Sequence, residues 1–140
     1  MKIKILLLFS SFLLLVVGIQ PAQATLSIGP SGVHDKLESN MVAEHSFQIK
    51  RTYPDQVSNF VVELEDVDAA KYVDLHGQDS FAIERGEYGY DYIFTIDTTG
   101  APEGKHEVDI SFVQETADKE GSTMAVRYGV QGTIYFEVVD

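Results

Sequence analysis

The sequence predicts an all-β protein, built as a single Greek-key β-sandwich of about seven strands. Along residues 25–140, apolar and polar side chains alternate with a period of two, as in strands that bury one face. Gly, Pro, Asn and Asp interrupt this alternation roughly every 8 to 12 residues. No segment of about a dozen residues keeps the apolar stripe of an amphipathic helix. A closed barrel is the alternative architecture for this pattern.

Residues 1–24 have the features of a cleaved secretory signal peptide. A short basic start precedes an almost unbroken apolar run over residues 5–19, and residues 22–24 supply the small-x-small pattern of a cleavage site. The apolar run is shorter than the ~20 residues that a membrane-spanning helix needs, which favours a cleaved signal peptide. An uncleaved membrane anchor is the alternative. We therefore expect a mature chain that begins near Thr25 and forms one domain over residues 25–140.

Charge and cysteine content narrow the class of partner. The formal net charge is −12, and it becomes −14 if Lys2 and Lys4 leave with the signal peptide. This charge disfavours nucleic acid and anionic membrane surfaces as partners. The chain has no cysteine, which excludes disulfides, thiol chemistry and a cysteine-linked lipid anchor. Because residues 133–140 carry no apolar tail, we expect secretion to the periplasm or medium, without a stable membrane anchor.

The first half of the chain predicts several short strands. The first covers residues 25–37 and is broken around Pro30, which is typical of a sheet edge because proline lacks a backbone donor. The next covers residues 44–53, and Arg51 interrupts its inner row, so we expect this strand to fray there. The inner residues of this strand are Phe47, Ile49 and Tyr53. Further strands are expected at residues 60–65, 72–75 and 80–84.

The segment from Gly86 to Tyr92 reads GEYGYDY and places three tyrosines on alternate positions. Extending this register puts Phe94 and Ile96 on the same face, so the segment is interpreted as one wall of the core. Tyr92 is expected in the core with its hydroxyl bonded at the rim, whereas Tyr88 and Tyr90 lie nearer the turn.

The last part of the chain predicts two long strands. The first covers residues 107–112, and a polar loop is expected at residues 114–123. Even-numbered positions from Met124 to Val138 are then apolar or glycine, which indicates one strand bent at its glycines. We expect this last strand, like the first, to lie at a sheet edge.

The number and spacing of these strands are typical of an immunoglobulin-like sandwich, although the buried tryptophan and paired cysteines of antibody domains are missing. The Gly-Pro break, the aromatic strand at residues 90–96 and the Pro-Glu-Gly-Lys-His turn at residues 102–106 resemble those of exported prokaryotic Ig-like modules. This group includes fibronectin-type-III-like surface domains and the amino-terminal domain of pilus chaperones. His106 stands where many members have a corner tyrosine, and an imidazole can also donate to a carbonyl.

The resemblance implies a cell-surface or periplasmic domain that binds a protein, a glycan or a second copy of itself. Pilus chaperones have two tandem sandwiches, whereas this chain has residues for one. Fold alone does not choose among these functions.

No catalytic motif accompanies the fold pattern, so we expect no enzyme activity, no catalytic residues and no cofactor. The four histidines fall in different segments and are interpreted as surface or corner residues. The densest acidic run is interpreted as a solvated face, with calcium binding as the alternative, since it lacks the glycine and final glutamate of an EF-hand loop. The histidines are His34, His45, His76 and His106. The acidic residues are Glu63, Glu65, Asp66, Asp68, Asp74 and Asp79.

Two functional hypotheses follow. The first is a non-catalytic secreted or cell-envelope module that mediates structural or protein–protein interaction, with an envelope or extracellular protein or a second copy as partner. Pairing at a sheet edge is the expected mode. The alternative is a carbohydrate-binding module that uses exposed aromatic side chains. The candidate ligand-contact residues are Tyr88, Tyr90, Tyr128 and Tyr135.

Overall fold

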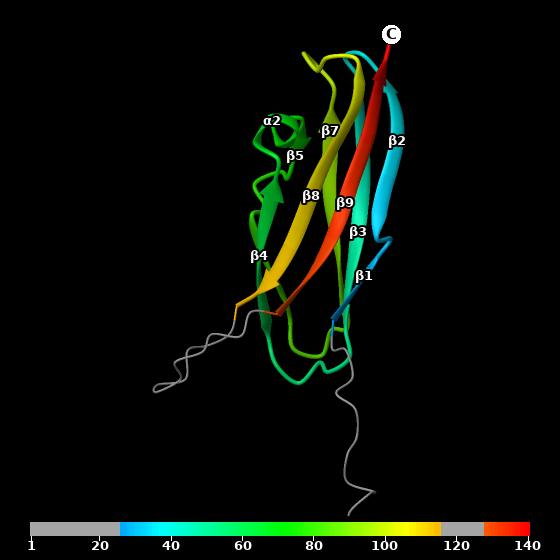
Figure 1. Ribbon diagram of the computed structural model, residues 1–140. Helices are drawn as coiled ribbons and strands as arrows, with labels where there is room; N and C mark the ends of the chain where they lie inside the picture. Colours follow the sequence, from blue (N-terminus) through cyan, green and yellow to red (C-terminus); the bar gives the residue numbers. More distant parts are fainter. Residues whose placement is uncertain (1–25, 116–127) are drawn as a thin grey trace, which may run out of the picture.

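The computed structural model describes residues 26–115 and 128–140, which form a sandwich of two β-sheets (Figure 1). The expected signal peptide, and the first residues of the expected last strand, Met124 and Val126, lie outside these ranges. The strands are β1 (Leu26–Gly29), β2 (Gly32–Glu38), β3 (Val42–Arg51), β4 (Ser58–Glu65), β5 (Val73–Asp74), β6 (Ser80–Ile83), β7 (Gly89–Asp97), β8 (Gly104–Gln114) and β9 (Tyr128–Val139).

One sheet has four strands in the order β1-β3-β7-β5, and the other has five in the order β2-β9-β8-β4-β6. All strand pairs are antiparallel except β2 with β9, which are parallel. The all-β sandwich is thus confirmed. The strands outnumber the expected seven partly because the first strand is divided between the two sheets.

That division occurs at Pro30, where the predicted break lies. The Gly29–Pro30 peptide is cis, and the chain passes from β1 at the edge of one sheet to β2 at the edge of the other. The prediction of edge strands at the start of the domain is confirmed. The prediction for the last strand is wrong, because β9 lies between β2 and β8.

β9 forms one strand over Tyr128–Val139, so the prediction of a single long last strand is confirmed for the described residues. It pairs with β8 without interruption from Val138 opposite Gly104 to Tyr128 opposite Gln114, so its glycines stay within the ladder. Gly132 serves the packing between the sheets, because a Cβ there would lie 2.9 Å from Cε1 of Phe47. A glycine in this strand therefore makes room for an aromatic ring of the facing sheet.

The core lies between the inner faces of the two sheets and is rich in aromatic rings. Phe47 of β3 stacks on Phe94 of β7 at 5.4 Å and meets Phe112 of β8 edge-on at 6.1 Å. Tyr92 is completely buried, and its hydroxyl donates to the carbonyl of Gln78 at 2.6 Å. The prediction that GEYGYDY contributes a wall of the core, with Tyr92 bonded at its rim, is confirmed.

Arg51 corrects the predicted inner row of β3. The strand ends at Arg51, as expected, but Arg51 itself is buried and Tyr53 is 60% exposed. The guanidinium donates to the carbonyls of Glu87 (2.8 Å), Glu84 (2.6 Å) and Gln56, and to the hydroxyl of Ser58 (2.8 Å). These bonds tie the β3–β4 loop to the β6–β7 loop. Arg51 can occupy a core position because the N–H donors of its guanidinium are hydrogen-bonded.

One short helix, α2 (Val67–Ala70), was not predicted. Asp66 caps it, since Oδ1 accepts from the backbone N–H groups of Asp68 at 3.1 Å and Ala69 at 3.3 Å. Within residues 26–115 and 128–140, no helix has the length and apolar character needed to cross a membrane.

Candidate functional site

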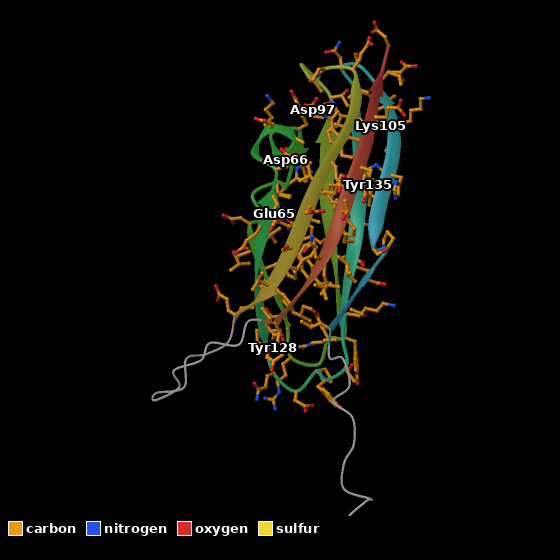
Figure 2. All side chains as sticks on the ribbon, viewed as in Figure 1. Glu65, Asp66, Asp97, Lys105, Tyr128 and Tyr135 are labelled. Atoms are coloured by element: carbon orange, nitrogen blue, oxygen red, sulfur yellow. The ribbon has the colours of Figure 1, made fainter. Side chains whose placement is uncertain are left out.

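The four candidate tyrosines differ in their surroundings, and Figure 2 shows Tyr128 near one end of the sandwich, well away from Tyr135. Tyr88 is 62% exposed in the β6–β7 loop, and Tyr128, 55% exposed, begins β9. Tyr90 is half-buried and stacks on Phe81 at 4.3 Å, so much of its ring is already covered. Tyr135 stands on the outer face of the five-stranded sheet.

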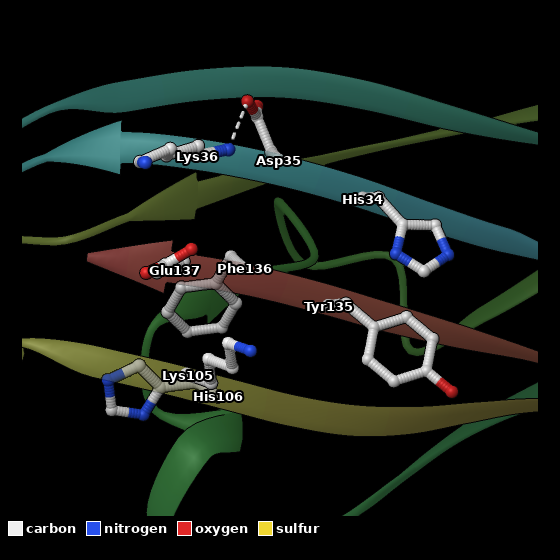
Figure 3. Close-up of a pocket in the computed structure, with 8 residues that line it drawn as sticks. All are labelled: His34, Asp35, Lys36, Lys105, His106, Tyr135, Phe136 and Glu137. Atoms are coloured by element: carbon white, nitrogen blue, oxygen red, sulfur yellow. Dashed lines mark hydrogen bonds between the residues drawn. The ribbon is translucent and has the colours of Figure 1, made fainter. Parts of the chain in front are cut away.

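Tyr135 stacks face to face on His34. The two residues are partners in the parallel β2–β9 register, and their ring centroids lie 4.5 Å apart with an interplanar angle of 12°. Figure 3 shows both rings standing out from their neighbouring strands. We call this pair the aromatic platform. Tyr135 is 37% exposed, so part of its ring is available to a ligand.

A groove of about 560 Å³ contains the aromatic platform and charged side chains from three strands. Lys36 of β2 and Lys105 of β8 are both register partners of Glu137 in β9. The three side chains therefore form a row across the sheet, one step along β9 from Tyr135. In the part of the chain that the structure describes, neither lysine of the groove takes part in an ion pair, whereas His45 pairs with Asp35 and His76 with Asp74.

Asp35 fixes the position of β2 beside this groove. Its Oδ1 accepts the backbone N–H of Lys36 at 2.8 Å, which is drawn as the dashed line in Figure 3. Its Oδ2 lies 2.7 Å from Nε2 of His45 in β3. The Asp35–His45 pair thus joins the edge of the five-stranded sheet to the four-stranded sheet.

The free side of β2 can be assigned from the bonds at its two ends. The N–H of Thr133 donates to the carbonyl of Ser31, and the N–H of Ser39 donates to the carbonyl of Val139, each at 3.2 Å. In a parallel pair alternate residues face the partner strand, so the odd-numbered residues of β2 face β9. The backbone groups of the even-numbered residues point outward. These are Gly32, His34, Lys36 and Glu38.

The outward edge of β2 is partly covered in its carboxyl-terminal half. Asp35 occupies the N–H of Lys36, and the hydroxyl of Thr98 donates to the carbonyl of Glu38 at 2.7 Å. These two bonds leave the outward edge open at Gly32 and His34, and the ring of His34 belongs to the aromatic platform.

His106 makes the corner bond that was expected at the turn of residues 102–106. Its Nε2 lies 2.8 Å from the carbonyl oxygen of Pro102, and because a carbonyl can only accept, Nε2 must carry the proton. The ring also stacks on Phe136 at 4.9 Å. The expectation that an imidazole can make the corner bond is confirmed.

The acidic segment shows no arrangement typical of a cation site. Asp66 is engaged in capping α2, and Glu65 lies opposite Asp109 in the β4–β8 register. Among the residues that the structure describes, no group of three or more His, Cys, Asp or Glu is placed to hold a metal ion.

Sequence reasoning found Tyr135 but missed His34, Lys36, Lys105 and Glu137 as its neighbours. Their outward positions follow from the period-two pattern of each strand. Their proximity does not, because it depends on the parallel pairing of β2 with β9, which joins segments about a hundred residues apart. The sequence signal that could have indicated this pairing was the Gly-Pro break, which lets the first strand change sheets.

The strand order, the sheet-switching first strand and the parallel β2–β9 pair form an immunoglobulin-like β-sandwich, and this fold is like that of PapD-like domains. Structural comparison supports this class. The PapD-like domain 7 of human CEP192, described as an ASH/PapD-like domain, superposes with a TM-score of 0.63 at 7% identity, covering 87% of this chain and 93% of that one.

Two bacterial structures that contain chaperones show the same likeness of fold. A chain from the Salmonella enterica SafA pilin–SafB chaperone complex gives a TM-score of 0.58 at 8% identity, covering 85% of this chain and 57% of that one. The E. coli chaperone DraB gives a TM-score of 0.56 at 13% identity, covering 80% of this chain and 54% of that one. The present chain thus spans little more than half of each of these two chains. No family model and no curated protein matches the sequence.

Proposed function

We propose that this protein is a non-catalytic, exported module of the cell envelope or extracellular space that binds another protein chain by strand addition. The observation that carries this proposal is β2, a seven-residue strand at the edge of the five-stranded sheet. Its even-numbered backbone groups point outward and provide donors and acceptors for an added strand.

The local surroundings of β2 favour a selective partner over indiscriminate pairing. Asp35 and Thr98 occupy backbone groups at Lys36 and Glu38, which limits the open edge to the region of His34. Charged side chains on an edge strand also oppose unspecific association. A partner strand must therefore match a short edge and tolerate its charges.

Two further observations support the proposal. The fold is like that of a chain from a pilin–chaperone complex and of a pilus chaperone, which makes a protein partner the first class to test. The first 24 residues have the composition of a secretory signal, which supports export. Amino-terminal sequencing of the exported protein should then begin near Thr25.

The edge can be tested with two variants at one position. His34→Pro removes the outward N–H and places a ring on the edge without removing a bond to β9. His34→Ala removes the same imidazole but keeps the N–H, so it is the matched control. Crosslinking and mass spectrometry on native envelopes should recover a protein partner, or a dimer, with the wild type and His34→Ala, and much less with His34→Pro.

Circular dichroism must first show that both variants fold. If the wild-type protein stays monomeric and captures no envelope protein, the proposed function is wrong. If capture is equal for His34→Pro and His34→Ala, the partner binds elsewhere and strand addition at β2 is wrong.

A further inference from the structure

We propose that the groove on the outer face of β2, β9 and β8 binds an acidic sugar, a saccharide unit that carries a carboxylate or sulfate. This site is distinct from the backbone edge used in the proposed function. It uses outward side chains of three strands: His34, Lys36, Lys105, Tyr135 and Glu137.

The aromatic platform provides a stacking surface for a sugar ring. The rings of Tyr135 and His34 are stacked with nearly parallel planes, so His34 covers one face of the Tyr135 ring and holds that ring upright on the sheet. The apolar C–H face of a pyranose can pack on the accessible part of such a ring, as apolar groups do on aromatic faces. Of the four candidate tyrosines, Tyr135 is the one that stands in a groove together with charged side chains from neighbouring strands (Figure 3).

The charge of the groove selects an anionic ligand. Lys36 and Lys105 flank Glu137 on its two neighbouring strands, and neither lysine is paired with a carboxylate in the described part of the chain. The row therefore carries two positive charges and one negative charge. Asp35 also lines the groove, but its carboxylate is bonded to the Lys36 N–H and to His45, and Glu107 lies opposite Tyr135 in β8. The two lysines are therefore the groups of the groove that favour an anionic group placed between them.

Glu137 distinguishes a sugar from a simple anion or an acidic peptide. A carboxylate between two lysines repels a second carboxylate, but it accepts hydrogen bonds from hydroxyl groups. A sugar acid supplies both kinds of group, since its hydroxyls can donate to Glu137 while its anionic group accepts from the lysines. The groove's volume of about 560 Å³ is also within the usual range of small-ligand sites.

The test measures binding of defined oligosaccharides to protein expressed from the full-length sequence and purified. Calorimetry compares a uronic-acid oligosaccharide, a sulfated one and a neutral one of the same length, each at low and at moderate salt. We expect the acidic ligands to bind, more tightly at low salt, and the neutral ligand to bind at least tenfold more weakly. The stronger of the two acidic ligands identifies the anionic group.

Variants connect the binding to the groove. Tyr135→Ala and the double variant Lys36→Gln/Lys105→Gln should each weaken acidic-sugar binding by about tenfold or more, which corresponds to about 1.4 kcal/mol. Tyr128→Ala removes a more exposed tyrosine outside the groove and should leave the affinity unchanged. Glu137→Gln should weaken sugar binding, although it makes the row more positive.

Several outcomes would overturn the inference. It is wrong if neither acidic oligosaccharide binds, if Tyr135→Ala binds as well as the wild type, or if Glu137→Gln strengthens binding as it would for a simple anion. A poly-glutamate peptide that binds with the same dependence on the two lysines would replace the sugar with a peptide. The capture of proteins by the β2 edge is measured separately with His34→Pro, so either idea can fail alone.

Discussion

At the scale of single residues, Arg51 shows how a charge can occupy a core position. A period-two pattern marks the site as inward-facing, but charge normally argues for the surface. The conflict disappears because four hydrogen bonds from its guanidinium reach three loop carbonyls and a serine hydroxyl. The sequence offers no signal for this, since the acceptors are mainly backbone groups contributed by the β6–β7 loop and the β3–β4 loop.

We expect Arg51→Met to lower the free energy of unfolding by about 2 to 4 kcal/mol, because it leaves several carbonyls without their donor. Chemical denaturation measures the effect. Lys50→Met, at the exposed neighbouring position, is the control and should change stability by less than about 0.5 kcal/mol. Equal stability of the two variants would show that the Arg51 bonds do not hold the two loops.

Tyr92 provides a prediction at alkaline pH. Burial raises the pKa of its hydroxyl above the ordinary value of 10.0, and the nearby charges of Tyr90 and Asp79 act in the same direction. The folded protein therefore keeps this proton at a pH where the unfolded chain loses it. The contribution to stability is constant below about pH 10 and is lost progressively above it.

Denaturation curves at pH 9, 10 and 11 test whether the free energy of unfolding falls as the pH rises above 10. The wild type should lose stability from pH 10 to 11, and Tyr92→Phe should lose less over the same interval. Tyr92→Phe also lacks the bond to Gln78 and should be about 1 kcal/mol less stable at neutral pH. Tyr128→Phe controls for the loss of an exposed hydroxyl, and the same alkaline slope in Tyr92→Phe and the wild type would contradict the prediction.

At the scale of elements, the strands themselves were predictable, whereas their partners were not. Alternation located most strands to within a few residues, because each buries one face. The error about β9 arose because a long strand at the chain's end gives no sign of its neighbours. Its place beside β2 depends on the earlier break at Pro30, which releases β2 to join the other sheet.

The role of Gly132 could not be predicted from the sequence either, because it depends on a side chain of the facing sheet. A Cβ at this position would lie 2.9 Å from Cε1 and 3.0 Å from Cζ of Phe47. We expect Gly132→Ala to cost about 1 to 3 kcal/mol, as overpacking forces the ring or the strand to shift. The midpoint of thermal unfolding measures this.

The matched control is Gly32→Ala in β2, where the nearest atom to a new Cβ is the carbonyl oxygen of Thr133 at an ordinary 3.4 Å. Its effect should be small. If both substitutions are equally mild, the sheets are less closely packed at Gly132 than the structure indicates.

At the scale of the whole molecule, fold class was predictable and the candidate site was not. Two-faced strands without helices leave little choice but a sandwich or barrel. The groove, in contrast, depends on three strands whose order emerges from the complete topology. Single exposed tyrosines were therefore visible in the sequence, but the lysines and the carboxylate that give Tyr135 a chemical context were not.

The net charge of −12 leads to the last prediction, which concerns cations. Repulsion among carboxylates opposes the compact state and is screened by any salt, so sodium chloride should raise the melting temperature from a low-salt baseline. Calcium would add to this only by binding a site of the folded state. Asp66 is already used to cap α2, and we found no three-ligand cluster in the described residues.

We therefore expect millimolar calcium to change the melting temperature no more than sodium chloride of equal ionic strength. Differential scanning calorimetry of the two series makes the comparison, with magnesium as a second control for divalent charge. A saturable rise with calcium beyond both controls would instead reveal a specific site. Substitution of the acidic residues of the β4–β5 region, beginning with Asp68→Asn, would then locate it, because Asp68 is exposed and its removal leaves the Asp66 cap in place.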